Sequence, residues 1–355
     1  MIAPGKLISM KEGYIMKSKN SKQKSKKLNK DTFLNKYSSI NLEDDYKKVE
    51  ERIPNFWEII EEIWEHYQDS AGTYKSTLKE IIDKISEKDL ENPVIHSVRY
   101  RIKDAESLIV KIIQKSACVP KEPQNNPEIE KYRNISKNNY YKIITDLIGV
   151  RILIRYRYQW EEVHNLIWSL YHSSEYGYIQ DWLSEYKNDP AMSSIVEQPR
   201  AYVKQEEDRV IYEKIGKNTF NIRNSDNHYA SVHYIINQSG RYCEIQVRTI
   251  FDEAWCECNH DCVYKPNINN NKTMQTLEQL SIILSQHTTA AESIVDLMCD
   301  LSKRTPPDRS KKVKKGGSSK DDEISSKQNT VKRFQDMVQY AEQISNFELP
   351  DILII

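Results

Sequence analysis

The sequence predicts an α+β fold, in which helices and β-strands build one principal domain with helical appendages. Apolar residues recur at helical spacing from about Asp44 to Leu90 and again from about Thr273 to Leu301, which indicates amphipathic helices. An apolar, β-branched run from Gly149 to Tyr156 is typical of a central strand. Residues 227–249 alternate polar and apolar side chains on both sides of a turn, as a β-hairpin does.

Six segments follow one another along the chain. They are a basic, disordered arm at 1–40, N-terminal helices at 41–92, a main domain at 93–268, a long helix at 269–303, a linker at 304–327 and a C-terminal helix at 328–355. Seven lysines between Lys17 and Lys30 give the arm its charge. Such an arm is either a solvated tail or a contact for phosphate groups. Residues 177–226 are charged and aperiodic, and we interpret them as an insertion with one strand near Ala201 to Lys204.

Local signals predict the other elements of the main domain. A strand is expected from Val94 to Arg101, and Asp104 is the expected N-cap of a helix that ends near Lys115. Further helices are predicted from Trp160 to Tyr171 and from about Ile250 to Asp261.

The composition is balanced in charge, with 52 basic and 52 acidic residues. A net charge of zero gives no whole-chain argument for binding nucleic acid or a membrane surface. No segment approaches the roughly 18 uninterrupted apolar residues of a membrane span. Six cysteines in 355 residues do not form a disulfide framework. We therefore expect a reduced, cytoplasmic protein with no membrane partner.

The predicted hairpin places polar residues on one face of the sheet, because side chains alternate along a strand. Asn237-Gln238-Ser239-Gly240 supplies the turn. If the loop has an even number of residues, one face carries Tyr229, Ser231, His233, Glu244, Gln246 and Arg248. This face is either a functional site or an ordinary half-solvated surface, and the alternation alone leaves both interpretations open.

A second group of polar residues lies at the start of the predicted helix near Asp104. Lys103, Ser107 and Lys111 are four residues apart, so they form one stripe near the helix N-terminus. Two ammonium groups and free N–H groups suit a polyphosphate, and a solvated lysine face is the alternative. Asp146 stands just before the apolar strand and, with Glu244, has the oxygen ligands that Mg²⁺ prefers. The alternative role of Asp146 is to cap a turn.

Four blocks of the chain, taken in order, resemble the synthetase domain of the RelA/SpoT family, which makes the alarmones ppGpp and pppGpp. The blocks are Arg101-Ile102-Lys103 with Ser107 and Lys111, Asp146-Leu147-Ile148-Gly149-Val150-Arg151, Tyr229-Ala230-Ser231-Val232-His233, and Glu244-Ile245-Gln246-Val247-Arg248-Thr249 followed by Trp255, His260, Tyr264 and Lys265. They cover about Arg99 to Lys265, and their common order makes coincidence a poor explanation.

The resemblance implies a mixed β-sheet of the nucleotidyltransferase type, flanked by helices, and a Mg²⁺-dependent transfer of pyrophosphate from ATP to the 3′-hydroxyl of GDP or GTP. By the family pattern, ATP is bound by Arg101 and Arg151, which stack on the adenine, and by Lys103, Ser107 and Lys111, which hold its phosphates. Asp146 and Glu244 would bind Mg²⁺ as the catalytic pair, and Glu244 would help to deprotonate the attacking hydroxyl. The acceptor would contact Tyr229, which stacks on its base, and His233, Gln246 and Arg248.

Four positions depart from the family pattern. His228 stands where Gly is usual, Ala230 where a basic residue is common, Glu253 where Asn or Asp is frequent, and Asn259 where Glu is common. Fewer cations would weaken the hold on the 5′-phosphates of GDP or GTP. The alternative acceptor is therefore the 3′ end of tRNA, which related growth-inhibiting toxins modify by the same chemistry. A third hypothesis is a nucleotide-binding regulator that has lost catalysis.

The C-terminal helix needs a partner for its apolar face, because Val331, Phe334, Val338 and Ala341 fall at three- and four-residue spacing. Its partner is the site itself, an antitoxin protein or a second copy of the chain in a homo-oligomer. The sequence does not choose among these three.

Two further motifs are interpreted as structural. Cys256, Cys258, His260 and Cys262 have the residue types of a zinc site. On one helix they divide between two faces, so structural zinc is not expected. His260-Asp261 resembles the family's hydrolase motif, but that domain needs more chain than the residues before Arg99 provide, so no hydrolase activity is expected.

Overall fold

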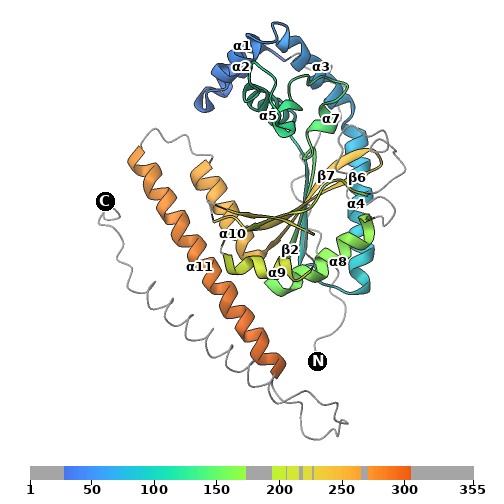
Figure 1. The fold of residues 1–355 in the computed structure, drawn as a ribbon, viewed down its shortest axis with the longest axis vertical. Helices are drawn as coiled ribbons and strands as arrows, with labels where there is room; N and C mark the ends of the chain where they lie inside the picture. Colours follow the sequence, from blue (N-terminus) through green and yellow to red (C-terminus); the bar gives the residue numbers. More distant parts are fainter. Residues whose placement is uncertain are drawn as a thin grey trace, which may run out of the picture. The chain divides into compact units, whose positions relative to one another are not determined.

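The computed structural model describes residues 28–172, 194–204, 206–215, 219–225, 228–264 and 271–304 (Figure 1). Contacts within the chain divide it into two compact units. Unit 1 comprises residues 1–154, 161–226 and 230–248, and unit 2 comprises residues 155–160, 227–229 and 249–355.

Four helices open the described part of unit 1, with a short 3-10 helix between the first two. They are α1 (Lys30–Lys36), η1 (Ser38–Ile40), α2 (Leu42–Glu50), α3 (Phe56–Asp69) and α4 (Ala71–Glu91). Phe56, Ile60, Ile63 and Tyr67 of α3 recur at four- and three-residue spacing, and all four are buried. This confirms the predicted amphipathic helices. α1 lies within the range 1–40 for which the sequence predicts a disordered arm, and residues 1–27 of that range lie outside the described residues.

Unit 1 is built around a seven-stranded sheet. The strands are β1 (Ser97–Ile102), β2 (Ile148–Ile154), β3 (Ser194–Ile195), β4 (Arg200–Val203), β5 (Asn221–Asn224), β6 (Ser231–Gln238) and β7 (Arg241–Thr249). The order is β1-β2-β7-β6-β4-β5, and β3 pairs with β6. β4 and β5 run parallel, whereas the β1–β2, β3–β6, β4–β6 and β6–β7 pairs are antiparallel. The predicted mixed sheet flanked by helices is therefore confirmed.

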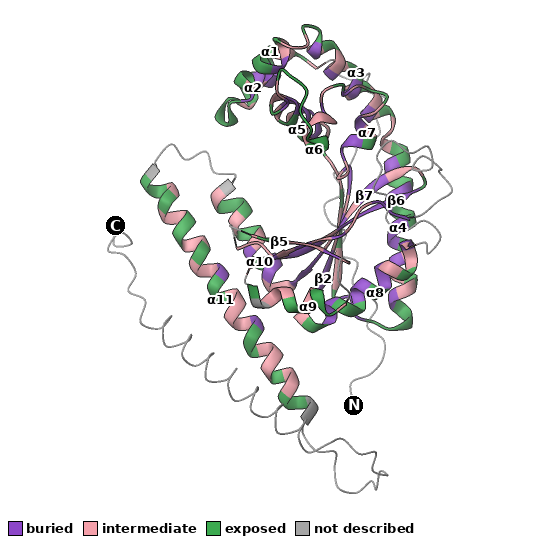
Figure 2. Cartoon of the chain, in the orientation of Figure 1, coloured by how far each residue is buried: buried purple, intermediate pink, exposed green. Residues whose placement is uncertain are grey.

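The core of unit 1 lies on the central strands, where buried residues concentrate on β2, β6 and β7 (Figure 2). β2 is rich in β-branched residues, which pack well in the interior of a sheet. Its Val150, Ile152 and Ile154 are accordingly at most 1% exposed. Other helices of unit 1 are α5 (Ala105–Ala117), α6 (Pro127–Glu130), α7 (Tyr140–Ile143), α8 (Trp160–Tyr171), η4 (Glu206–Asp208) and α9 (Arg209–Glu213). The bounds of α8 are those that the sequence predicts.

The described part of unit 2 contains two consecutive helices after β7. These are α10 (Ile250–Asn259), which continues into a π-helical segment at His260–Tyr264, and α11 (Asn271–Arg304), with η2 (Arg157–Gln159) contributed from earlier in the chain. α10 and α11 are joined by a hydrogen bond from Trp255 Nε1 to the Ser281 carbonyl (2.9 Å) and one from Ser281 Oγ to Asn259 Oδ1 (2.6 Å). The predicted linker at 304–327 and C-terminal helix at 328–355 lie outside the described residues, apart from Arg304 at the end of α11.

Within the described ranges, no helix combines the length and the apolar composition that crossing a bilayer requires.

Candidate functional site

The hairpin of β6 and β7 gathers polar side chains on one face. Its loop has two residues, Ser239 and Gly240, with φ values of 53° and 74°, as a type I′ turn requires. This even-numbered loop pairs His233 with Gln246 and Ile235 with Glu244. Ser231, His233, Glu244, Gln246 and Arg248 therefore share one face, which we call the polar wall. Val232, Cys243, Ile245 and Val247 lie on the other face and are buried, as the sequence predicts.

A chain of hydrogen bonds connects the side chains of the polar wall. His233 Nδ1 lies 3.1 Å from Glu244 Oε1, and Gln246 Nε2 donates to Glu244 Oε2 at 2.8 Å. Arg248 Nη2 donates to Gln246 Oε1 at 2.6 Å. Each side chain thus fixes the orientation of the next, and the free carboxylate lone pairs of Glu244 have a defined direction.

The environment of Glu244 keeps its carboxyl ionised. Burial raises the pKa of Glu244, but its interactions with His233 and its hydrogen bond with Gln246 together outweigh burial, so the net pKa is lowered. The negative charge of Asp146 also acts on Glu244 and raises its pKa. Asp146 and Glu244 therefore lie within electrostatic reach of each other, although the sequence separates them widely.

Asp146 lies between two lysines. Lys103 Nζ is 2.9 Å from Asp146 Oδ2, and Lys111 Nζ is 2.8 Å from Asp146 Oδ1. Burial raises the pKa of Asp146, but the charges of Lys111 and Lys103 outweigh it, so the pKa is lowered. Burial lowers the pKa of Lys103, and the charge of Asp146 opposes this change. The three groups form a charge cluster of two cations and one anion.

The two lysines reach Asp146 from different structural elements. α5 begins at Ala105 and its N-cap is Asp104, whose carboxylate accepts a hydrogen bond from the Ser107 N–H at 3.0 Å. Lys103 precedes the helix, so only Ser107 and Lys111 belong to the predicted helical stripe. The N–H of Ser107 is occupied by the cap. The charge cluster therefore depends on the β1–α5 connection, which carries Lys103, as well as on α5, which carries Lys111.

Arg101 and Arg151 lie on one face of the β1–β2 pair. Arg101 is opposite Gly149 and Arg99 is opposite Arg151, so the two predicted adenine-stacking residues are diagonal neighbours. A Cβ added at Gly149 would lie 3.4 Å from Arg101 Cγ and 3.5 Å from Arg101 Nε. The Arg101 side chain therefore extends across Gly149, which has no side chain to obstruct it.

The same sheet face continues onto β4, which adds two polar residues that the sequence did not place on this face. Arg200 of β4 is opposite His233, and Tyr202 is opposite Ser231. The Tyr202 and His233 rings are 5.0 Å apart, and Arg200 forms an ion pair with Glu197. The sequence signal was the alternation in Arg200-Ala201-Tyr202-Val203, but without a pairing partner it could not assign a face to either residue.

Tyr229 belongs to unit 2 and lies in the connection before β6. Its neighbour His228 has a φ of 56°, a left-handed conformation that favours glycine. Gly, the residue that the family resemblance leads us to expect here, adopts this conformation without a steric cost. The predicted stacking role of Tyr229 stays a prediction.

In the described part of the chain, no group of three or more His, Cys, Asp or Glu residues is arranged to hold a metal ion. Cys258 and Cys262 are exposed, and Cys256 is half-buried. Asp146 and Glu244 are a pair of ionised carboxylates, 14% and 18% exposed. Mg²⁺ commonly takes one or two carboxylates together with substrate phosphates, so this pair fits a shared ion.

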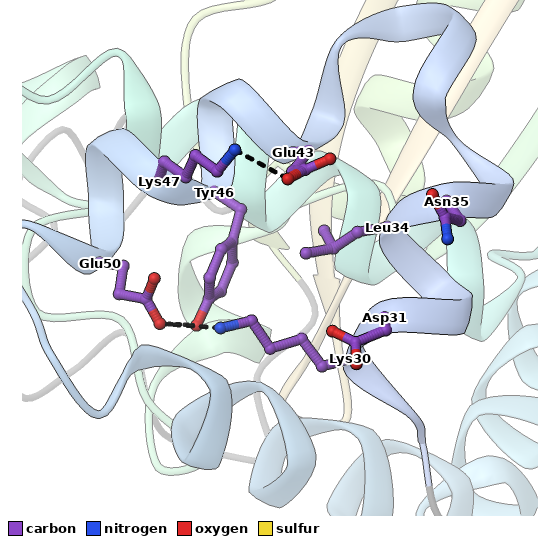
Figure 3. Close-up of a pocket in the computed structure, with 8 residues that line it drawn as sticks. All are labelled: Lys30, Asp31, Leu34, Asn35, Glu43, Tyr46, Lys47 and Glu50. Carbon is purple, nitrogen blue, oxygen red and sulfur yellow. Dashed lines mark hydrogen bonds and ion pairs between the residues drawn. The ribbon is translucent and has the colours of Figure 1, made fainter.

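A cavity of about 380 Å³ lies apart from these residues, between α1 and α2 (Figure 3). Its charged groups pair with one another, because Lys30 contacts Glu50 and Lys47 contacts Glu43, at 2.8 and 2.7 Å. None of the predicted site residues lines it.

Several solved structures are similar to this chain. Small alarmone synthetase 2 from Bacillus subtilis is 21% identical, with 67% of this chain and 99% of that chain covered and a TM-score of 0.39. A GTP pyrophosphokinase family protein from Streptococcus pneumoniae is 17% identical, with 69% and 98% covered and a TM-score of 0.38. Small alarmone synthetase 1 from Bacillus subtilis bound to pppGpp is 16% identical, with 65% and 94% covered and a TM-score of 0.38. The search of curated proteins gives no match.

A family model for the region found in RelA and SpoT proteins matches residues 100–269. This range runs from within β1 to beyond α10, and therefore includes the charge cluster at Asp146 and the polar wall. The chain thus carries a region of the kind found in RelA and SpoT proteins.

Proposed function

We propose that this protein is a Mg²⁺-dependent pyrophosphotransferase that moves pyrophosphate from ATP to the 3′-hydroxyl of GDP or GTP and so makes ppGpp or pppGpp. The observation that carries the proposal is the Lys103–Asp146–Lys111 cluster within electrostatic reach of the ionised Glu244. Transfer of phosphoryl-type groups depends mainly on positioning and charge neutralisation, and this arrangement supplies both.

The donor side is assigned to the residues around α5 and the β1–β2 pair. Arg101 and Arg151 share a face and have the planar cations that stack on an adenine ring. Lys103 and Lys111 hold the ATP phosphates, with Ser107 as a hydroxyl donor beside them. Because both lysines already meet at one point, they place positive charge on neighbouring phosphates without a large rearrangement.

The acceptor side is assigned to the polar wall and Tyr229. Tyr229 stacks on the acceptor base, whereas His233, Gln246 and Arg248 orient the ribose and Glu244. The 3′-oxygen forms a bond to the β-phosphorus of ATP as the bond from that phosphorus to the α,β-bridging oxygen breaks. AMP leaves, and the hydroxyl proton passes to a carboxylate oxygen of Glu244.

Asp146 and Glu244 would hold Mg²⁺ through their carboxylate oxygens. Bound Mg²⁺ supplies neutralisation of the charge on the transferred phosphates. The two carboxylates suit this role because the surrounding residues lower the pKa of each and keep both ionised at neutral pH.

The acceptor is the part of the proposal with an alternative. His228 and Ala230 stand where the family resemblance leads us to expect Gly and a basic residue. The 3′ end of tRNA is therefore the alternative acceptor. That reaction would use the same donor side and the same Glu244. A regulator that has lost catalysis would not need an ionised carboxylate pair beside two lysines.

The proposal is tested by incubating the purified protein and Mg²⁺ with ATP labelled at its terminal phosphate. GDP, GTP, ATP and bulk tRNA are offered separately. We expect label in GDP or GTP, and no transfer when EDTA removes the metal or when Glu244→Gln replaces the base. Glu58→Gln makes the same change on an exposed position of α3 and should leave transfer intact. Label in tRNA alone would replace the alarmone assignment, and label in no acceptor would support the regulator.

A further inference from the structure

Lys103 is held by its backbone from two sides. It lies between β1 and α5, outside the bounds of both elements. Its N–H donates to the Leu147 carbonyl at 2.9 Å, and its carbonyl accepts a hydrogen bond from Tyr67 Oη at 2.6 Å. Leu147 follows Asp146, which is the ion-pair partner of the Lys103 side chain. The Tyr67 hydroxyl therefore acts on the residue that places an ammonium group beside Asp146.

Tyr67 is well suited to fix this point. It lies near the end of α3, is 5% exposed, and has the rings of Tyr74 and Tyr140 at 5.2 and 6.3 Å. Burial raises the pKa of Tyr67, so the hydroxyl stays protonated and donates. A buried phenol needs a hydrogen-bond partner, and the Lys103 carbonyl is that partner.

The same N-terminal helices also hold both ends of α5. At its first turn, Glu106 accepts a hydrogen bond from Tyr37 Oη at 2.8 Å and forms an ion pair with Lys36. At its other end, Arg52 donates to the carbonyls of Ser116 and Val119, at 3.1 and 2.5 Å. Arg52 thus adds side-chain hydrogen bonds to the backbone turn in which α5 ends. Residues before the family-matched range thus fix the element that carries Ser107 and Lys111.

We propose that Tyr67 is a positioning residue for Lys103, and that α3 is in this way part of the donor site. The inference rests on the proposed function of Lys103 as a phosphate ligand. A lysine side chain has many rotamers, so the location of its ammonium group depends on how firmly its backbone is held. Small errors in the position of a reacting group cost a large part of the rate.

Tyr67→Phe tests this proposal, because it removes one oxygen atom and retains the packing of the ring. We expect the kcat/KM for ATP to fall by roughly tenfold to a hundredfold, while the KM for the acceptor stays within about twofold. Tyr46→Phe is the matched control, since the buried Tyr46 also donates one hydrogen bond, to Glu50 at 2.8 Å, on α2. It should lose similar thermal stability and keep the wild-type kcat/KM.

Hydrogen–deuterium exchange provides a second readout that does not depend on activity. Tyr67→Phe should accelerate amide exchange in residues 103–108, and Tyr46→Phe should not. If Tyr67→Phe changes only the melting temperature, with unchanged kcat/KM and exchange, Tyr67 is merely structural and the proposal is wrong. If the wild-type protein transfers nothing, the proposed function fails instead, and unchanged exchange at 103–108 would then also reject the positioning role.

Discussion

A buried histidine makes the stability of unit 1 depend on pH. His164 of α8 is 3% exposed, and its Nδ1 lies 3.0 Å from the Tyr234 hydroxyl. Burial lowers the pKa of His164 to about 4. In the unfolded chain the same imidazole titrates near its ordinary pKa of about 6.5. The unfolded state therefore binds a proton at a higher pH than the folded state does.

The sign of the effect follows from this difference. The stabilisation is complete above pH 6.5, declines as the pH falls below the unfolded pKa, and is lost at about pH 4, where the folded state also binds the proton. We expect about 3 kcal/mol of unfolding free energy to disappear across this interval through His164 alone. Urea unfolding of the wild type and of His164→Gln between pH 7 and 4 measures it. The variant should show a flatter pH dependence, and the exposed control His96→Asn should keep the wild-type slope.

At the scale of elements, α5 links the sheet to the N-terminal helices. Asp104 caps its N-terminus, Tyr37 and Lys36 contact its first turn, and Arg52 caps its C-terminus. The helix that carries Lys111 is therefore held at both ends by side chains of the preceding helical region.

Removing the Asp104 cap tests how much this one hydrogen bond at the N-terminus of α5 contributes to the free energy of unfolding. Asp104→Ala leaves the Ser107 N–H without its carboxylate, and we expect a loss of about 1 kcal/mol in unfolding free energy. Asp31→Ala removes the same charge from the first turn of α1, where Asn29 and not Asp31 is the cap. That control should lose less than half as much. Equal losses in chemical denaturation would show that charge, and not the cap, accounts for the effect.

Some features of these elements could be predicted from the sequence, and others could not. The hairpin was predictable because Gly240 and the strict alternation of Cys243 to Thr249 are local signals. The N-cap Asp104 was predictable for the same reason. The face of Arg200 and Tyr202 was not, because it depends on pairing with β6 across a stretch without clear periodicity. The convergence of Lys103 and Lys111 on Asp146 is likewise a tertiary fact that helical spacing did not contain.

At the scale of the whole molecule, a buried carboxylate holds the segments of unit 2 to one another. Glu292 of α11 is 3% exposed and accepts hydrogen bonds from Arg157, at 2.7 Å, and from Thr249. Thr249 is the N-cap of α10, and Arg157 belongs to η2. One side chain of α11 thus connects three segments that are far apart in the sequence.

We expect Glu292→Ala to destabilise unit 2 by about 3 kcal/mol, because removing one partner of a buried ion pair leaves the other without compensation. Arg157 is 23% exposed, which keeps the expected loss at the lower end of the range for such pairs. Hydrogen–deuterium exchange in α10 and α11 measures the change locally. Glu278→Ala, on an exposed position of α11, removes an equal charge and should leave exchange unaltered.

The last strand of the sheet in the sequence occupies a central position in it, because β7 lies between β2 and β6. During synthesis on the ribosome, a nascent chain that has not reached Arg241 has two separate groups of strands. Each has an open edge where β7 will later pair, and open edges associate with other chains. Glu244 lies on this late strand, so a prematurely terminated product carries the donor residues without their carboxylate partner. If the proposed function holds, translation must pass the hairpin before the protein can be active, and truncated chains are expected to be inert and prone to aggregation.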